Sequence, residues 1–139
     1  GLDGRKMSKS YNNTIPLFVP AKRLRKLIMK IKTNSQGPDE PKDPDACTLF
    51  QIYRAFAQPE EVEALRARYA QGIAWGEMKQ LLFEYINNLL EAPRARYEDL
   101  LQHPEQIEKI LQEGARKARE YSRPFLSSVR EAIGVQAVG

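Results

Sequence analysis

Apolar residues recur at helical spacing along most of the chain, from residue 20 to residue 133. The first set falls at the i, i+3, i+4 and i+7 positions that share one helical face: Leu24, Leu27, Ile28 and Ile31. Five more sets follow: Leu49, Ile52, Tyr53 and Phe56; Val62, Leu65 and Tyr69; Met78, Leu81, Leu82, Tyr85, Ile86, Leu89 and Leu90; Ile107, Ile110, Leu111, Ala115 and Ala118; Phe125, Leu126, Val129 and Ile133. The pattern predicts an all-α fold, a bundle of about five or six helices on short connections.

Proline and glycine mark the expected ends of these helices. The prolines that open a helical pattern, where a missing N–H costs nothing, are Pro20, Pro59 and Pro104. Gly72 and Gly134 are suited to C-terminal stops. We expect Pro93 to kink or break the long helix that begins near Trp75. Residues 104–118 and 125–133 are accordingly expected as two separate helices.

The first 19 residues do not follow the helical pattern. Residues 1–13 are rich in glycine, serine and asparagine and are predicted to form a loop, and residues 14–19 a short strand. Residues 33–46 contain Gly37 and three prolines among acidic side chains, which is typical of a connector.

Basic residues concentrate at one end of the chain. The net charge is +4, yet residues 1–32 hold nine lysines and arginines and a single acid, Asp3. A polyanion would be attracted to this end. The candidates for contact with RNA backbone are Lys22, Arg23, Lys26 and Lys30 on the first helix, and Arg116, Arg119 and Arg123 near the end, where Glu113 and Glu120 are interleaved. A charged arc opposite an apolar stripe is also what any solvated surface helix presents.

Several classes of site are disfavoured by composition. Cys47 is the single cysteine, so an internal disulfide and an iron–sulfur cluster are both excluded, and a reducing cytoplasmic compartment is expected. No apolar run approaches the ~20 residues of a membrane span. No protein-held metal site is expected. The chain begins at Gly1 without methionine, and we interpret it as a fragment.

Lys6 and Lys9 carry the clearest chemical signal. An ammonium on a flexible stem is a mobile point charge, well suited to phosphate oxygens whose charge changes during a reaction. The small residues around the two lysines, Ser8 and Ser10 among them, would let both ammonium groups and backbone N–H groups approach one polyphosphate.

The run Lys6-Met7-Ser8-Lys9-Ser10 matches the signature loop of class I aminoacyl-tRNA synthetases at every position. Residues 1–5 before it and 11–15 after it resemble the tryptophanyl and tyrosyl subclass of that family. Residues 72–79 resemble the segment that opens a long helix in the helical domain of tryptophanyl members. Residues 113–118, followed by a short helix, are similar to the C terminus of those members.

The resemblance implies a function, partners and site residues. Residues 1–19 would be the C-terminal edge of a Rossmann-type catalytic domain, and residues 20–139 a helical anticodon-binding-type domain. The parent enzyme would activate tryptophan with ATP and Mg²⁺, load it onto tRNA(Trp) and form a homodimer in the cytoplasm. Lys6 and Lys9 would be catalytic, holding the β- and γ-phosphates, while Met7, Ser8, Lys9 and Ser10 would bind ATP.

One departure limits the chain itself. The second class signature, His-Ile-Gly-His or a variant, is absent, and the single histidine, His103, lies far from the loop. The chain alone is therefore not expected to make an adenylate. Two alternatives stay open: a fragment of a tyrosine–tRNA ligase, or a non-enzymatic helical module that binds RNA or protein and carries the motif by accident.

Overall fold

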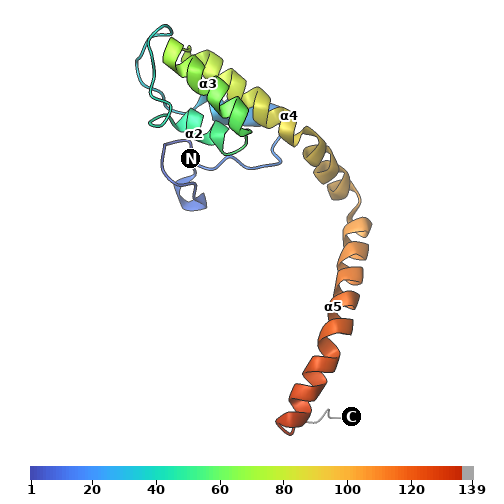
Figure 1. Ribbon diagram of the computed structural model, residues 1–139. Helices are drawn as coiled ribbons and strands as arrows, with labels where there is room; N and C mark the ends of the chain where they lie inside the picture. The colour runs from blue at the N-terminus through green and yellow to red at the C-terminus, as the bar shows by residue number, and fades with distance from the viewer. Residues whose placement is uncertain (136–139) are drawn as a thin grey trace. The chain divides into compact units, whose positions relative to one another are not determined.

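The computed structural model describes residues 1–135, and the regular secondary structure in that range is all helical, with no strand (Figure 1). The elements are η1 (Lys9–Tyr11), α1 (Ala21–Met29), α2 (Thr48–Arg54), α3 (Pro59–Gln71), α4 (Trp75–Gln102) and α5 (Pro104–Ala132). They belong to two compact units, Gly1–Ala95 and Arg96–Gly139. The all-α prediction is confirmed.

The short strand expected at residues 14–19 does not form. This segment is irregular and turn-like, with no ladder pairing to a second segment in residues 1–135. A strand is stable only through such pairing, and the apolar side chains of the segment are used differently. Ile15 and Val19 pack against the helical core of the first unit.

The core of the first unit is made by the apolar stripes that the sequence predicts. Its buried side chains are Leu24, Ile28, Ile31, Leu49, Phe50, Ile52, Tyr53, Val62, Leu65, Tyr69, Ile73, Met78, Leu82 and Ile86. Aromatic rings interlock within it. Phe50 meets Tyr69 edge-on with 5.2 Å between ring centroids, and Tyr53 meets Tyr85 at 4.8 Å. Burial of these stripes provides most of the stability of the unit.

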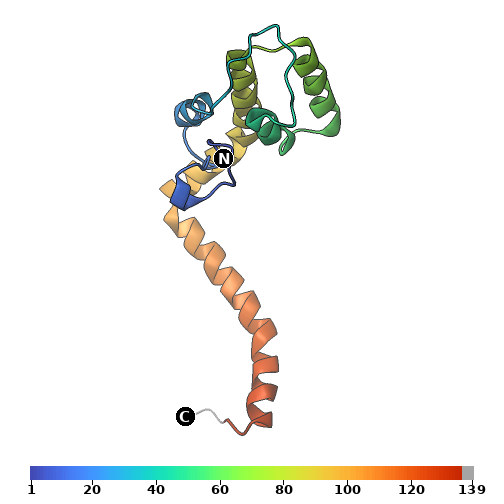
Figure 2. The same cartoon turned by 90° about the vertical axis from the view of Figure 1, so that its left-hand side faces the viewer.

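Polar contacts fix the helices that surround this core. α1 lies beside α4 (Figures 1 and 2), where Lys79 Nζ donates to the carbonyl of Met29 at 3.2 Å and Arg25 donates to Gln80 at 3.3 Å. The end of α3 is joined to the start of α4 by the Arg68–Glu77 ion pair. The contacts of Lys79 and Arg25 hold α1 with its apolar side toward the core and most of its cations toward solvent.

Neither internal proline ends a helix. Pro93 lies inside α4 and Pro124 lies inside α5, which runs continuously where two helices were expected (Figure 2). A proline leaves the carbonyl four residues earlier without its helical donor. Those carbonyls belong to Leu89 and Glu120, and because both residues and both prolines are exposed, water can hydrate them. Of the kink or break expected at Pro93, the break is therefore wrong, as is the break expected before residue 125, whereas the stop at Gly134, with φ 75°, is confirmed.

The acidic connector between α1 and α2 folds around a buried lysine. Lys42 is buried, and its ammonium donates to the carbonyls of Gly37 at 2.5 Å and Glu40 at 2.9 Å, 5.3 Å from the centre of the Trp75 ring. Carbonyl oxygens and an aromatic face replace the water that the ammonium loses. The loop is thereby fixed against the start of α4.

In the second unit, α5 carries its large apolar side chains exposed. They include Ile107, Ile110, Leu111, Phe125, Leu126 and Val129. Among the described residues, none of the helices combines the length and apolarity needed to cross a membrane.

A carboxylate at the start of α3 makes stability depend on pH. Glu61 accepts from the backbone N–H of Gln58 at 2.9 Å and from the Tyr85 hydroxyl at 2.6 Å, and these bonds, that of Tyr85 foremost, lower its pKa from the ordinary 4.5. A depressed pKa contributes stability that is complete above pH 4.5 and is lost as pH falls through the folded-state value.

Glu61→Gln should therefore lower the melting temperature at pH 7, with the difference from wild type shrinking below pH 4.5. Glu60→Gln, an exposed neighbour, is the control in the same thermal melts; a constant difference for Glu61→Gln at all pH values would contradict this account.

Gly72 is required by both its backbone and its surroundings. Its φ is 98°, and an added Cβ would lie 2.7 Å from the backbone of Pro38 and Asp39. We expect Gly72→Ala to lower the free energy of unfolding by about 2 kcal/mol or more, since strain and overlap add. Gly76→Ala is the matched control, because nothing lies within 4 Å of its Cβ position and alanine favours a helix by up to about 1 kcal/mol. Equal effects in denaturant titrations would refute the steric explanation.

Candidate phosphate-binding loop and basic helix

The loop at the start of the chain is folded around one buried amide, that of Asn13. Its side chain is 2% exposed and its Nδ2 donates to Asp3 Oδ1 at 2.7 Å and to the carbonyl of Lys6 at 3.1 Å. Its Oδ1 accepts from the backbone N–H of Ser8 at 2.8 Å. Its own carbonyl accepts from the N–H of Leu2 at 2.9 Å. Four bonds from one residue therefore close the segment that carries the signature run.

Asp3 is committed to contacts within the loop. Besides the amide of Asn13 it accepts from Arg5 Nε at 2.8 Å and from the Arg5 backbone N–H at 3.1 Å. The hydrogen bond from Asn13, followed by those from Arg5, holds the pKa of this carboxyl well below its usual range. Asp3 is therefore ionised at neutral pH, and its charge is balanced by Arg5 and not by the two signature lysines.

Lys6 and Lys9 project from this folded loop into solvent. Both are exposed, and neither forms an ion pair within residues 1–135. Lys9 begins η1, whose end is closed by Asn12 in the left-handed conformation (φ 50°), with its N–H bonded to the carbonyl of Lys9 at 3.1 Å. The hydroxyls of Ser8 and Ser10 lie 2.8 Å apart. The run thus presents two ammonium groups and two hydroxyls without an internal counter-ion.

Met7 points in the opposite sense, toward the helices. It is 41% exposed and lines a cavity of about 40 Å³ with Ile15, Leu17, Phe56, Ile86 and Leu90. A flexible thioether suits such an irregular apolar gap. Met7 therefore ties the middle of the loop to α4 and to Phe56, just beyond the end of α2.

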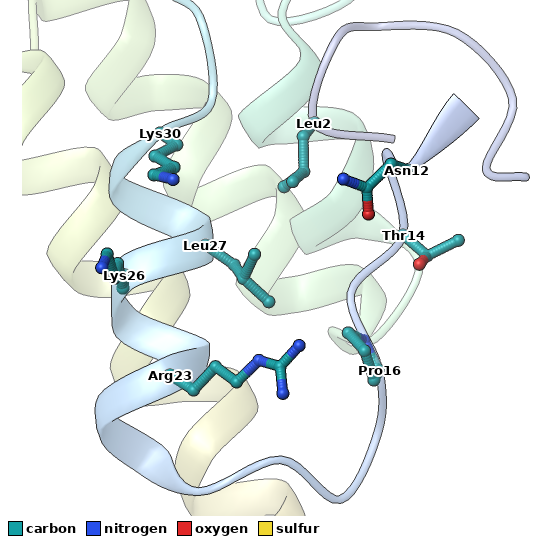
Figure 3. A pocket seen from close by; sticks show the side chains of 8 residues that line it. All are labelled: Leu2, Asn12, Thr14, Pro16, Arg23, Lys26, Leu27 and Lys30. Atoms are coloured by element: carbon teal, nitrogen blue, oxygen red, sulfur yellow. The ribbon is translucent and has the colours of Figure 1, made fainter. Parts of the chain in front are cut away.

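The basic arc of α1 faces the front segment across a groove of about 490 Å³ (Figure 3). One wall is formed by Leu2, Asn12, Thr14 and Pro16, and the other by Arg23, Lys26 and Leu27 of α1 with Lys30, the residue that follows the helix. The Arg23 side chain extends from α1 toward the front segment. The fourth candidate of α1, Lys22, lies instead beside a shallow hollow with Arg25, Lys26, Met29 and Lys30. Three of the four predicted cations, Arg23, Lys26 and Lys30, therefore line this groove.

The three late candidates on α5 differ in their availability. Arg116 forms ion pairs with Glu113 at 2.7 Å and with Glu120, and the pKa of Glu113 is lowered chiefly by Arg116. Arg119 and Arg123 line a hollow beside Arg116 and form no ion pair within residues 1–135. The interleaved acids noted in the sequence thus engage one of the three arginines.

Two buried polar residues of the first unit gave no signal in the sequence. Asn13 is one, because asparagine is an ordinary turn residue and only the folded loop makes it a hub. Arg94 is the other: it is 8% exposed, its Nη1 donates to Asn87 at 3.1 Å, and its Nε and Nη2 have no partner within residues 1–135. The described residues contain no cluster of three or more histidine, cysteine or acidic side chains arranged for a metal.

Comparison with known proteins agrees with this geometry. A family model described as "tRNA synthetases class I (W and Y)" matches residues 1–91. The tryptophan–tRNA ligase of Pseudomonas aeruginosa is 51% identical over 138 residues, covering 99% of this chain and 31% of the relative, and that of Neisseria meningitidis is 52% identical over 136 residues, covering 98% and 40%. A crystal structure of tryptophanyl-tRNA synthetase from Campylobacter jejuni, complexed with ADP and tryptophan, superimposes with a TM-score of 0.87 at 38% identity, covering 96% of this chain and 42% of that one.

The chain spans less than half the length of these relatives. The family match nevertheless covers most of the chain and includes the signature run, the groove and the core of the first unit. The chain therefore belongs to the class I tRNA synthetases of the tryptophan and tyrosine group.

Proposed function

We propose that this chain is the C-terminal part of a tryptophan–tRNA ligase, which activates tryptophan with ATP and transfers it to tRNA(Trp). The observation that carries the proposal is the signature loop itself, folded on Asn13 with both lysines exposed and without an internal counter-ion. Relatives of about 50% identity over the whole chain bear the name tryptophan–tRNA ligase.

In the first step of this reaction, a carboxylate oxygen of tryptophan attacks the α-phosphorus of ATP. The bond from that phosphorus to the bridging oxygen of the β-phosphate breaks, and pyrophosphate leaves with its Mg²⁺. Lys6 and Lys9 hold the β- and γ-phosphates and offset the negative charge that builds up on the leaving group. A terminal hydroxyl of tRNA then attacks the activated carbonyl, and AMP is released.

The other residues of the loop place these ammonium groups. Ser8 and Ser10 donate to phosphate oxygens, and Met7 ties the loop to the helices. Mg²⁺ would accompany ATP, held mainly by the ATP phosphates and by water. The amino-acid pocket and the His-Ile-Gly-His signature belong to the remainder of the enzyme, and residues 1–19 form the edge of that catalytic domain.

The helical part, from residue 20 onward, binds tRNA. Cations without ion pairs among the described residues support this role at Lys22, Arg23 and Lys26 on α1, at Lys30 just after it, and at Arg119 and Arg123 on α5, with Arg116 held by its acids. Phosphate contacts of this kind weaken as salt rises. The full-length enzyme works in the cytoplasm as a homodimer.

A tyrosine–tRNA ligase is the second candidate, because the matching family model includes both amino acids. Pyrophosphate exchange measured with the full-length protein separates the two. Exchange that depends on tryptophan and not on tyrosine supports the proposal, and the reverse dependence overturns it.

Lys9 is expected to act mainly on the transition state. In the full-length protein, Lys9→Gln should slow tryptophan-dependent ATP–pyrophosphate exchange by about a hundredfold or more, as loss of one charged stabilising group does elsewhere. Tryptophan affinity should stay within about twofold, since this side chain acts on the phosphate end. Lys109→Gln, an exposed lysine of α5, controls for charge. Wild-type exchange rates in Lys9→Gln would refute the role given to this residue.

The fold of the loop should depend on the amide of Asn13. Asn13→Asp replaces two N–H donors by a carboxylate facing Asp3, at a cost of about 1–3 kcal/mol for each buried hydrogen bond that is removed. We expect trypsin to cut after Arg5, Lys6 and Lys9 at least about tenfold faster, because cleavage follows the population of opened loop. Asn88→Asp, at an exposed position of α4, is the matched control. Equal cleavage rates in the two variants would show that the amide does not hold the loop.

A further inference from the structure

The groove between α1 and the front segment has two walls of different character. The α1 wall contributes Arg23, Lys26 and Lys30, spaced three and four residues apart and so on one helical side. The opposite wall contributes the polar side chain of Asn12, and Leu2 and Leu27 point into the space between the walls (Figure 3). Cations on one side and an apolar floor suit a ligand that carries phosphate and also a less polar sugar face.

The charge of this groove is uncompensated. None of its lining residues is acidic, and none of its three cations forms an ion pair within residues 1–135. Asp3 is adjacent in sequence to the lining residue Leu2, but its carboxylate is already bonded to Asn13 and Arg5. Like charges held together on one helix destabilise it unless an anion lies between them. A bound anion would therefore reduce the repulsion among Arg23, Lys26 and Lys30, which no acidic side chain of the groove reduces.

The size and openness of the groove favour a chain over a free ion. At about 490 Å³ it exceeds the volume of a single phosphate and falls in the range of ligand sites. The basic surface continues past it to the hollow beside Lys22 and Arg25. A polyanion with successive phosphates could contact both places at once, whereas a free phosphate could use only one.

The groove also shares its polar wall with the signature loop. Asn12 closes η1, with its N–H on the carbonyl of Lys9, and Leu2 is bonded through its N–H to Asn13. A ligand seated against Asn12 and Leu2 therefore restrains the same short segment that presents Lys6 and Lys9.

We propose that this groove seats a ribose-phosphate stretch of tRNA between Arg23, Lys26 and Lys30 on one side and the base of the signature loop on the other, so that bound tRNA holds the loop. The inference rests on the proposed function, because it takes tRNA as the polyanion. Coupling of this kind is reciprocal: bound ATP raises the affinity for tRNA by the same factor by which bound tRNA raises the affinity for ATP.

The binding test uses the full-length protein and a tRNA(Trp) transcript over a salt series. Arg23→Gln/Lys26→Gln should weaken tRNA binding about tenfold and reduce the slope of log affinity against log salt by about 2, one unit for each phosphate that is no longer neutralised. Lys32→Gln/Arg96→Gln removes the same charge from exposed residues outside both the groove and the adjoining hollow and should change affinity less than about threefold.

Two results in that experiment would overturn the inference. Equal decreases in affinity for the two double variants would mean that only the overall positive field attracts RNA. Unchanged tRNA affinity with a raised KM for ATP in Arg23→Gln/Lys26→Gln would mean that the groove serves the nucleotide instead.

Proteolysis tests the coupling to the loop. Saturating tRNA should slow tryptic cleavage after Lys6 and Lys9 several-fold in wild type and in Lys32→Gln/Arg96→Gln, but not in Arg23→Gln/Lys26→Gln compared at equal tRNA occupancy. Equal protection in all three proteins would overturn the coupling. The proposed function and this inference can fail separately. If the wild-type protein shows no tryptophan-dependent exchange, but Arg23→Gln/Lys26→Gln still binds RNA more weakly than the control variant does, the proposed function is contradicted and RNA binding at this groove is supported.

Discussion

The site depends on a single buried amide. The carboxamide of Asn13 joins Asp3, the carbonyl of Lys6 and the N–H of Ser8, which would otherwise belong to a loop of small polar residues with no core of its own. Because Asp3 is satisfied by this amide and by Arg5, it does not neutralise the signature lysines. The same set of bonds therefore gives the loop its shape and leaves its positive charge available.

α1 gives the loop its neighbour. Leu24 and Ile28 are fully buried on one side of the helix, and this burial determines the direction of every cation on the other side. The contact from Lys79 to the end of α1 adds a fixed register against α4. The groove thus arises because an apolar stripe and a basic arc occupy one short helix whose apolar side is already committed to the core.

Helical periodicity predicted the elements well where burial and periodicity coincide. The stripes of α1, α2, α3 and the first half of α4 supply the core, and Gly72 ends α3 as expected. The prediction was wrong where a local rule acted on an exposed position: Pro93 and Pro124 remain inside helices because solvent can satisfy the carbonyls that they orphan. It was also wrong for residues 14–19, whose extended pattern has no strand to pair with in the part of the chain that the structure describes.

The sequence by itself determined the helical class, the positions of the core residues and the identity of the signature run, because each of these is encoded by local spacing or by residue type. Tertiary structure alone decided that Asn13 is the hub of the loop, that Lys42 is buried among carbonyls, and that Arg23, Lys26 and Lys30 line one groove with Leu2 and Asn12. Those relations join residues that no helical spacing pairs, through hydrogen bonds and shared surfaces. No periodicity records them, since they exist only once the apolar stripes have packed and fixed where each polar side chain points.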